Sequence, residues 1–251
     1  MIKMSLSFIK YKKPSSNPVI QQITEEIKNN LILLRYISRI FAIYSINDNA
    51  NLEEIDRYIS DTINNPALTL CSEKKNKIID LIKNIYRSLN FEKIRSEILE
   101  NIVYELGPFK INHAINAFLE PRIMDGEVII GNSDHRCDVV FYNNDTSPLE
   151  ILECKTNINN SIPSNMPFER IKDKIKNQIL YMVNVYNYLK EHYCEPAIFI
   201  ACYNVDYKKA QKNLNENWGY AFLKCIGPED IIRISLYKKT YKKEEVLNYV
   251  D

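Results

Sequence analysis

The sequence is poor in the residues and patterns that mark several classes of protein. It has five glycines, three histidines and one tryptophan in 251 residues, and its six cysteines include no CxxC pair. The histidines are scattered, so the ligand spacing of a zinc site is absent. Every apolar run is shorter than the roughly 20 residues that a membrane span needs, and the N-terminus lacks the apolar region and cleavage site of a signal peptide. We therefore expect a soluble, cytoplasmic protein that does not associate with membranes.

An excess of charge of one sign is also lacking. The 33 Lys and Arg residues nearly balance the 32 Asp and Glu residues, which leaves a formal net charge of +1. No strong overall field therefore draws the chain to nucleic acid or to an anionic membrane, and any nucleic-acid surface would have to be a local patch. The length suffices for one large domain or two small ones, each with a hydrophobic core. Cysteines inside apolar runs such as FIACYN are typical of small core residues in a reducing compartment.

Residues 1–90 have helical periodicity. Asn17 and Pro18 are a capping residue and a first-turn proline, and apolar residues then recur at helical spacing as far as Phe41. Further helices are expected over residues 51–63 and from Ser72, as the capping residue, to Leu89. This part of the chain predicts an α-helical N-terminal subdomain whose function its residues do not indicate.

From Asn90 onward, helical and strand-like segments alternate. A helix over residues 91–106 is expected to end at Gly107, and two more are expected over residues 167–192 and 207–216. The expected strands are EVIIG (127–131), CDVVFY (137–142), LEILECK (149–155), PAIFIACY (196–203) and YAFLKCI (220–226). The order predicts an α/β fold with a mixed central sheet flanked by helices, in which residues 91–251 form one domain beside the N-terminal subdomain.

Charged residues stand at the ends of two of these apolar strands. Alternation places Glu153 and Lys155 on one face at the end of LEILECK. The NNDTSP turn reverses the chain, so Asp138 at the start of the preceding strand can lie beside them. Two neighbouring carboxylates provide the hard oxygen ligands that Mg²⁺ or Mn²⁺ requires. The competing interpretation is a solvated ion pair at the rim of an edge strand, which would contribute little.

Two further features bear on this cluster. Gln178 interrupts the apolar stripe of the helix expected after Pro167, and a buried amide needs hydrogen-bond partners. It would either orient Lys155, a water or a phosphate, or bond to nearby backbone. The helix before the sheet carries Glu97, Glu100 and Glu105, and spacing alone leaves all three as candidates or as ordinary exposed glutamates.

In this order, the motifs resemble those of the PD-(D/E)xK nuclease superfamily, which has a restriction-endonuclease-like fold. The matching segments are ILENIVYEL, CDVVFY, LEILECK and NQILYMVNVY, within about residues 91 to 226. They correspond to the family's L-E-x-x-V helix, its two acid-bearing strands and its Q-x-x-x-Y helix. Cys137 replaces the family's proline, and Tyr181 comes one residue early in the last motif. The N-terminal helices lie outside the resemblance.

The resemblance implies a Mg²⁺-dependent endonuclease or phosphodiesterase, with DNA favoured as substrate and a role in restriction or another defence function. It implies that Asp138, Glu153 and the backbone carbonyl of Cys154 bind Mg²⁺ or Mn²⁺, and that Glu100 reaches a second metal or a metal-bound water. Lys155 would position or deprotonate the attacking water, and Gln178 would assist. A bound dication polarises the phosphate and lowers the pKa of bound water.

The substrate surface and two alternative functions stay open. Lys172, Lys174 and Lys176 weakly indicate a nucleic-acid contact, although lysines at this spacing are also typical of a solvated helix face. The first alternative is an inactive nuclease-fold subunit that binds nucleic acid or a partner. The second is a helical interaction protein that acts through residues 15–89. A homodimer or an activating protein partner would suit the nuclease, but no residue specifies either, and nothing separates DNA from RNA.

Overall fold

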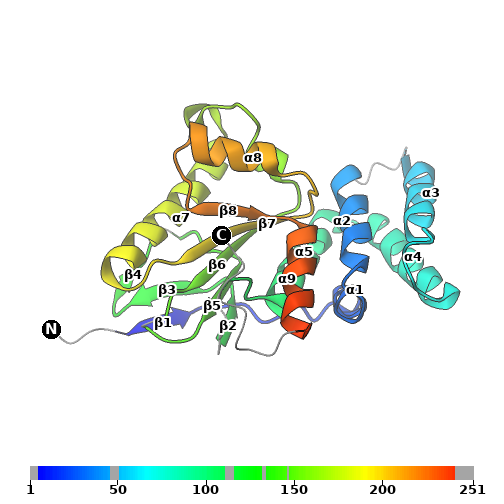
Figure 1. Cartoon of the computed structure of the whole chain (residues 1–251), viewed down its shortest axis with the longest axis horizontal. Coiled ribbons are helices and arrows are strands. Elements are labelled where there is room, and N and C mark those ends of the chain that lie inside the picture. The colour runs from blue at the N-terminus through cyan, green and yellow to red at the C-terminus, as the bar shows by residue number, and fades with distance from the viewer. Residues whose placement is uncertain (1–4, 46–50, 111–115, 132–133, 146, 241–251) are drawn as a thin grey trace.

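The computed structural model describes residues 5–45, 51–110, 116–131, 134–145 and 147–240. At its centre is a five-stranded mixed sheet with the order β2–β5–β6–β7–β8 (Figure 1). These strands are β2 (Asn116–Leu119), β5 (Val139–Tyr142), β6 (Glu150–Lys155), β7 (Ala197–Cys202) and β8 (Leu223–Ile226). The pairs β2–β5 and β5–β6 are antiparallel, whereas β6–β7 and β7–β8 are parallel. The expected α/β fold with a mixed central sheet flanked by helices is confirmed.

The prediction for the first expected strand, EVIIG, is wrong. Of EVIIG (127–131), only β4 (Val128–Ile129) is a strand, and it belongs to a second sheet with β3 (Arg122–Asp125) and β1 (Leu6–Ile9). The place beside β5 is taken by β2, which we did not expect. The turn between β3 and β4 contains Gly126 with a φ of 57°, a left-handed conformation that glycine adopts readily. The Asp125-Gly126 pair was therefore the sequence signal of a local hairpin.

The helical part of the chain follows the expected pattern with local differences. Its helices are α1 (Pro18–Asn29), α2 (Leu33–Ile43), α3 (Leu52–Ile63), α4 (Ser72–Tyr86) and α5 (Phe91–Leu106). The side chain of Asn17 caps α1 by accepting a 3.0 Å hydrogen bond from the N–H of Val19. The helix expected as far as Phe41 is divided into α1 and α2. Ser72 is the first residue of α4 rather than its cap, and residues 6–9 form a strand.

Helix α5 packs on one face of the central sheet, and α1 to α4 pack beside α5 and one another, with α3 and α4 farthest from the sheet (Figure 1). Their buried residues form one hydrophobic cluster with sheet residues that include Phe141, Leu152 and Phe199. Helix α9 (Pro228–Thr240), which the sequence reading did not include, contacts α2 and adds Ile231 and Ile232 to this cluster. The division into a subdomain of residues 1–90 and a second domain stays a prediction. The hydrophobic cluster contains residues from both sides of that proposed boundary.

The opposite face carries α6 (Ile158–Ser161), α7 (Asp173–His192) and α8 (Lys208–Lys212), together with the small sheet. The helix expected from Pro167 begins as a 3-10 turn over Phe168–Arg170, and α7 starts only at Asp173. Cysteines 137, 154, 202 and 225 are buried, which confirms their expected place in the core. Helix α7 lies against the strand that carries Glu153 and Lys155 and brings Gln178 to them.

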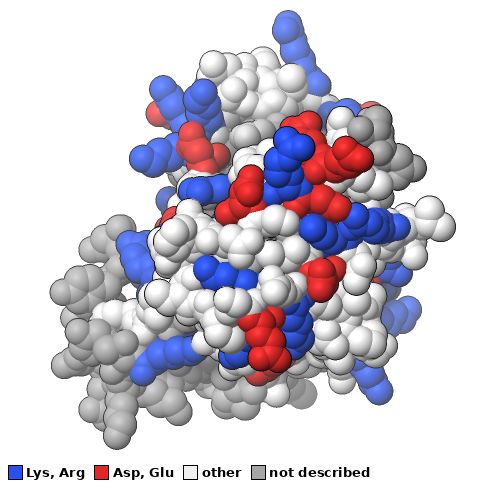
Figure 2. Space-filling view, turned by 90° about the vertical axis from the view of Figure 1, so that its right-hand side faces the viewer, with Lys and Arg blue, Asp and Glu red and all other residues white. Residues whose placement is uncertain are grey.

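Charges of both signs share the face formed by the N-terminal helices. This face lies on the right in Figure 1, where α3 and α4 are, and Figure 2 shows Lys and Arg interspersed there with Asp, Glu and uncharged residues. It is therefore not a broad basic surface. In the part of the chain that the structure describes, every helix is too short or too polar to cross a membrane.

Candidate active site

Asp138 and Glu153 meet where β5 and β6 are adjacent. The antiparallel register pairs Val139 with Leu152, so Asp138, which directly precedes β5, lies next to Glu153 on β6. The backbone N–H of Cys154 donates a 2.5 Å hydrogen bond to Oδ2 of Asp138. Burial raises the pKa of Asp138 well above its ordinary value, and the charges of Glu153 and Glu100 raise it further. Burial and the neighbouring acids therefore favour the protonated form of Asp138 in the absence of a cation.

Lys155 and Gln178 complete a closed set of hydrogen bonds with Glu153. The Lys155 ammonium lies 2.6 Å from Oε1 of Glu153 and 2.8 Å from Oε1 of Gln178. The Gln178 amide nitrogen donates to the same Glu153 oxygen. Burial alone would lower the pKa of Lys155, but Glu153 and Asp138 outweigh it and raise that pKa. Lys155 therefore carries a proton at neutral pH.

The structure contradicts the interpretation of Glu153 and Lys155 as a solvated ion pair at the rim of an edge strand. Strand β6 lies between β5 and β7 in the middle of the sheet, and the Glu153 side chain is only 1% exposed. Gln178 likewise bonds to the two charged side chains rather than to nearby backbone. The structure thus brings together four residues that the sequence reading selected: Asp138, Glu153, Lys155 and Gln178.

One oxygen of Glu153 has no protein partner. Oε2 is buried and accepts no hydrogen bond from the residues that the structure describes, which is costly for a carboxylate unless a cation or a donor satisfies it. Mg²⁺ is typically bound by one or two carboxylates and several waters. Among the described residues, no group of three or more His, Cys, Asp or Glu side chains is arranged to hold a metal. A divalent ion at Asp138 and Glu153 would therefore have two carboxylate ligands, with water in the other positions; binding by the Cys154 carbonyl stays a prediction.

Of the three candidate acids on α5, Glu100 is the one coupled to this site. Its charge contributes to the raised pKa of Asp138, and burial raises the pKa of Glu100 itself. Glu97 instead accepts a 3.0 Å hydrogen bond from the Ser15 hydroxyl. Glu105 pairs with Lys28 at 2.8 Å. Glu100 is therefore the acid that can act with Asp138.

Lys12 is a neighbour of the site that the sequence reading missed. Its ammonium lies 3.0 Å from Glu120, 3.5 Å from Glu100 and 3.7 Å from Glu97. The backbone N–H of Lys12 donates to the carbonyl of Leu119 at 2.8 Å, which fixes the segment beside β2. No local sequence pattern indicated this residue, because only the long-range pairing of the chain brings it to α5.

Tyr181 packs in the core instead of reaching the charged residues. It is 2% exposed, and its side chain is hydrogen-bonded to that of Cys137. A Cβ atom added at Gly131 would come within 2.4 Å of the Tyr181 ring, so the ring lies directly over that glycine. Its position one residue early in the motif therefore corresponds to a packing role.

The lysines at the start of α7 differ in their surroundings. Lys172 and Lys174 are exposed, whereas Lys176 donates a 3.2 Å hydrogen bond to the carbonyl of Glu169. Lys174 precedes Gln178 by one helical turn and so shares its helix face. A nucleic-acid contact by these lysines stays a prediction.

Comparisons with known proteins name no family for this chain. No family model matches it, and no curated protein does. Among solved structures, the chain is similar to protein VC1899 from Vibrio cholerae, with a TM-score of 0.41 and 14% sequence identity. The similarity covers 92% of this chain and 57% of that one, so the chain spans little more than half of VC1899.

Proposed function

We propose that the chain is a divalent-metal-dependent nuclease that hydrolyses phosphodiester bonds in nucleic acid, with DNA favoured. One observation carries the proposal. Glu153 is buried beside Asp138, with one oxygen bound by Lys155 and Gln178 and the other without a partner in the described part of the chain. A buried acid with an unsatisfied oxygen next to a second acid is a natural cation site. A cation there would lie beside a protonated lysine, as hydrolysis of an anionic phosphate requires.

Each residue has a distinct role in this proposal. Asp138 and Glu153 bind the ion, which would polarise the phosphate and acidify a water molecule. Lys155 donates a hydrogen bond to a phosphate oxygen and stabilises the negative charge that develops there. Its raised pKa makes it a poor acceptor for the proton of the attacking water. We therefore assign Lys155 to positioning and charge stabilisation rather than to deprotonation.

Gln178 and Glu100 assist from the two neighbouring helices. Gln178 holds the Lys155 ammonium and Glu153 in fixed orientations from α7. Glu100 reaches toward Asp138 from α5 and would bind a second ion or a water on the first. By the resemblance, cleavage would leave a 5′-phosphate and a 3′-hydroxyl. A defence role, a homodimer and an activating partner belong to the same proposal.

The contact between Lys12 and Glu100 favours one second candidate. An ammonium already neutralises the helix acid, as suits a nuclease-fold protein that has lost catalysis and binds nucleic acid or a partner. Metal binding separates the two candidates, because the inactive subunit needs no ion at Glu153.

The test is cleavage of duplex DNA, single-stranded DNA and RNA with Mg²⁺, Mn²⁺ or EDTA. Glu153→Gln keeps the shape and polarity of the side chain but removes its charge, and Glu73→Gln is the matched control at an exposed position on α4. Metal-dependent cleavage that is lost in Glu153→Gln and kept in Glu73→Gln would support the proposal. Cleavage that survives in Glu153→Gln would contradict it.

A further inference from the structure

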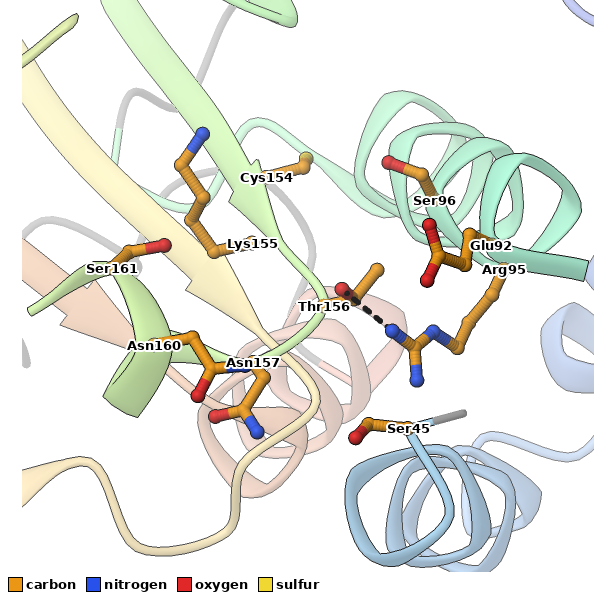
Figure 3. A pocket seen from close by; sticks show the side chains of 10 residues that line it. All are labelled: Ser45, Glu92, Arg95, Ser96, Cys154, Lys155, Thr156, Asn157, Asn160 and Ser161. Carbon is orange, nitrogen blue, oxygen red and sulfur yellow. Dashed lines mark hydrogen bonds between the residues drawn. The ribbon is translucent and has the colours of Figure 1, made fainter. Parts of the chain in front are cut away.

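A polar cavity adjoins the candidate active site. Its volume is about 420 Å³, and it lies between α5, the end of β6 and α6. Figure 3 shows the residues that line it, and Lys155 and Cys154 are among them. The cavity and the active site therefore share the end of β6.

Arg95 is a buried cation in the lining of this cavity. Its side chain lies among the lining residues in Figure 3, and the residue is only 5% exposed. One terminal nitrogen donates to the carbonyl of Phe41 at 3.0 Å, and the other donates to the Thr156 hydroxyl at 3.1 Å. Nε is buried, and none of the described residues forms a hydrogen bond with it. Within the described residues, no carboxylate forms an ion pair with Arg95.

A purely structural role explains only part of this arrangement. The bond to Phe41 satisfies a carbonyl in the last turn of α2, as a basic side chain near a helix C-terminus often does. This bond leaves Nε without a partner among the described residues, and the Phe91 ring, whose centroid is 5.1 Å from the guanidinium carbon, offsets the positive charge only in part. Burying a charge without an ion-pair partner is expensive. Burial also lowers the pKa of Arg95, and the nearby charge of Glu92 offsets only part of that effect.

The lining suits a tetrahedral oxyanion. Arg95 and Lys155 are cationic residues of the lining, with the Lys155 ammonium bonded to Glu153 and Gln178. Among the lining residues that the structure describes, Glu92 is the only carboxylate. Asn160 and Ser161 add an amide and a hydroxyl group from α6. Guanidinium groups bind phosphate through several parallel N–H donors, with charge-assisted bonds stronger than those to neutral acceptors.

We propose that this cavity binds a phosphate group of a nucleic-acid strand, next to the phosphodiester bond held at Asp138 and Glu153. The inference that the phosphate belongs to a nucleic-acid strand rests on the proposed nuclease function. The inference that the cavity binds phosphate does not. Because Lys155 lines both places, the group in the cavity is a terminal phosphate or the next phosphate along the same strand.

The first experiment measures binding of inorganic phosphate to the full chain by calorimetry, with EDTA and at constant ionic strength. Asn160→Asp places a negative charge in the cavity, and Asn159→Asp places the same charge on the neighbouring residue of α6, which does not line it. Both positions are exposed, so both variants should fold. We expect phosphate to bind the wild type and Asn159→Asp equally, and Asn160→Asp about tenfold more weakly. No saturable binding, or equal affinity in both variants, would overturn the proposal.

Arg95→Lys provides a second comparison, because it keeps the charge but loses the forked donors. We expect weaker phosphate binding in this variant while its circular dichroism spectrum stays native. If the variant does not fold, the two α6 variants decide the outcome.

The second experiment identifies the source of the phosphate. Short oligonucleotides with a terminal phosphate or a terminal hydroxyl compete with inorganic phosphate in the presence of Ca²⁺. Tighter binding of the phosphorylated strand, by about tenfold, identifies a terminal phosphate, and equal competition by both identifies an internal one. Failure of both to compete overturns the strand as source. Phosphate binding without metal-dependent cleavage would refute the proposed nuclease function and leave the phosphate site standing. Metal-dependent cleavage without phosphate binding would support the nuclease function and refute the phosphate site.

Discussion

Gln178 accepts a 2.8 Å hydrogen bond from the ammonium of Lys155, and its amide nitrogen donates to the Glu153 carboxylate that the same ammonium contacts. One neutral side chain from α7 thus fixes both charged residues of β6. Without it, Lys155 could turn away and Glu153 would lose a donor.

Gln178→Ala should therefore lower kcat/KM and the affinity for Mn²⁺ by about 10- to 100-fold, the usual effect of removing a group that orients metal ligands. Asn177→Ala, at the exposed neighbouring position, is the control and should leave both unchanged. Steady-state kinetics and calorimetry measure the two quantities. Wild-type values in Gln178→Ala would show that this amide is only a core residue.

Metal binding should stabilise the wild-type protein through Glu153. At a Mn²⁺ concentration of about 100 times Kd, the free energy of unfolding should rise by about 2.7 kcal/mol. Glu153→Gln should remove this gain because it removes a negatively charged ligand. Urea unfolding with Mn²⁺ or with EDTA provides the measurement. Equal stabilisation of both proteins would place the ion elsewhere.

The raised pKa of Asp138 predicts how stability depends on pH. Above the ordinary carboxyl pKa, the folded protein holds a proton that the unfolded chain has lost. The free energy of unfolding without metal therefore falls as pH rises toward the raised pKa. Burial raises the pKa of Glu100 as well, which adds a contribution of the same sign.

Asp138→Asn should weaken this pH dependence and stabilise the metal-free protein at about pH 8 by about 1 kcal/mol or more, because the amide needs neither a proton taken up on folding nor a buried charge. Urea unfolding with EDTA between about pH 5 and pH 8 tests this expectation. Asp80→Asn, at an exposed position on α4, is the matched control. A slope in Asp138→Asn identical to that of the wild type would contradict the burial of this carboxylate.

Lys12 should stabilise the acids on α5 by a modest amount. Lys12→Ala removes the cation that Glu97, Glu100 and Glu120 share. The loss should be up to about 1 kcal/mol, because Lys12 is 38% exposed and water screens the interaction. The effect should shrink in high salt, and Lys13→Ala should lack it. A salt-independent loss would indicate packing rather than charge.

The sequence predicted the elements with strong periodicity and the residues they carry. The bounds of α5 agree with expectation, and β6 and β7 agree within one residue at each end. Their long apolar patterns and the short turn before β6 were enough to bring Asp138 to Glu153. Gln178 was recognisable because a polar residue interrupted an apolar stripe.

Other elements lacked a local signal or had one that was overlooked. Strand β2 has only four residues and pairs with β5 across an inserted hairpin. Helix α9 had a sequence signal that we overlooked, namely Pro228 at its start and Glu229 and Asp230 in its first turn. The positions of Lys12 and Arg95 depend on which distant segments pack together, and a single sequence does not encode that locally.

The central position of β6 determines when the charged centre forms during synthesis. Glu153 and Lys155 pair with Ile200 and Cys202 of β7, and Gln178 lies on the helix that connects the two strands. A nascent chain that ends at Lys155 already contains every acid of the site, but it has neither the amide that orients them nor the strand that encloses them. During synthesis, the complete centre, with its orienting amide and its enclosing strand, can therefore form only after Cys202 has been added.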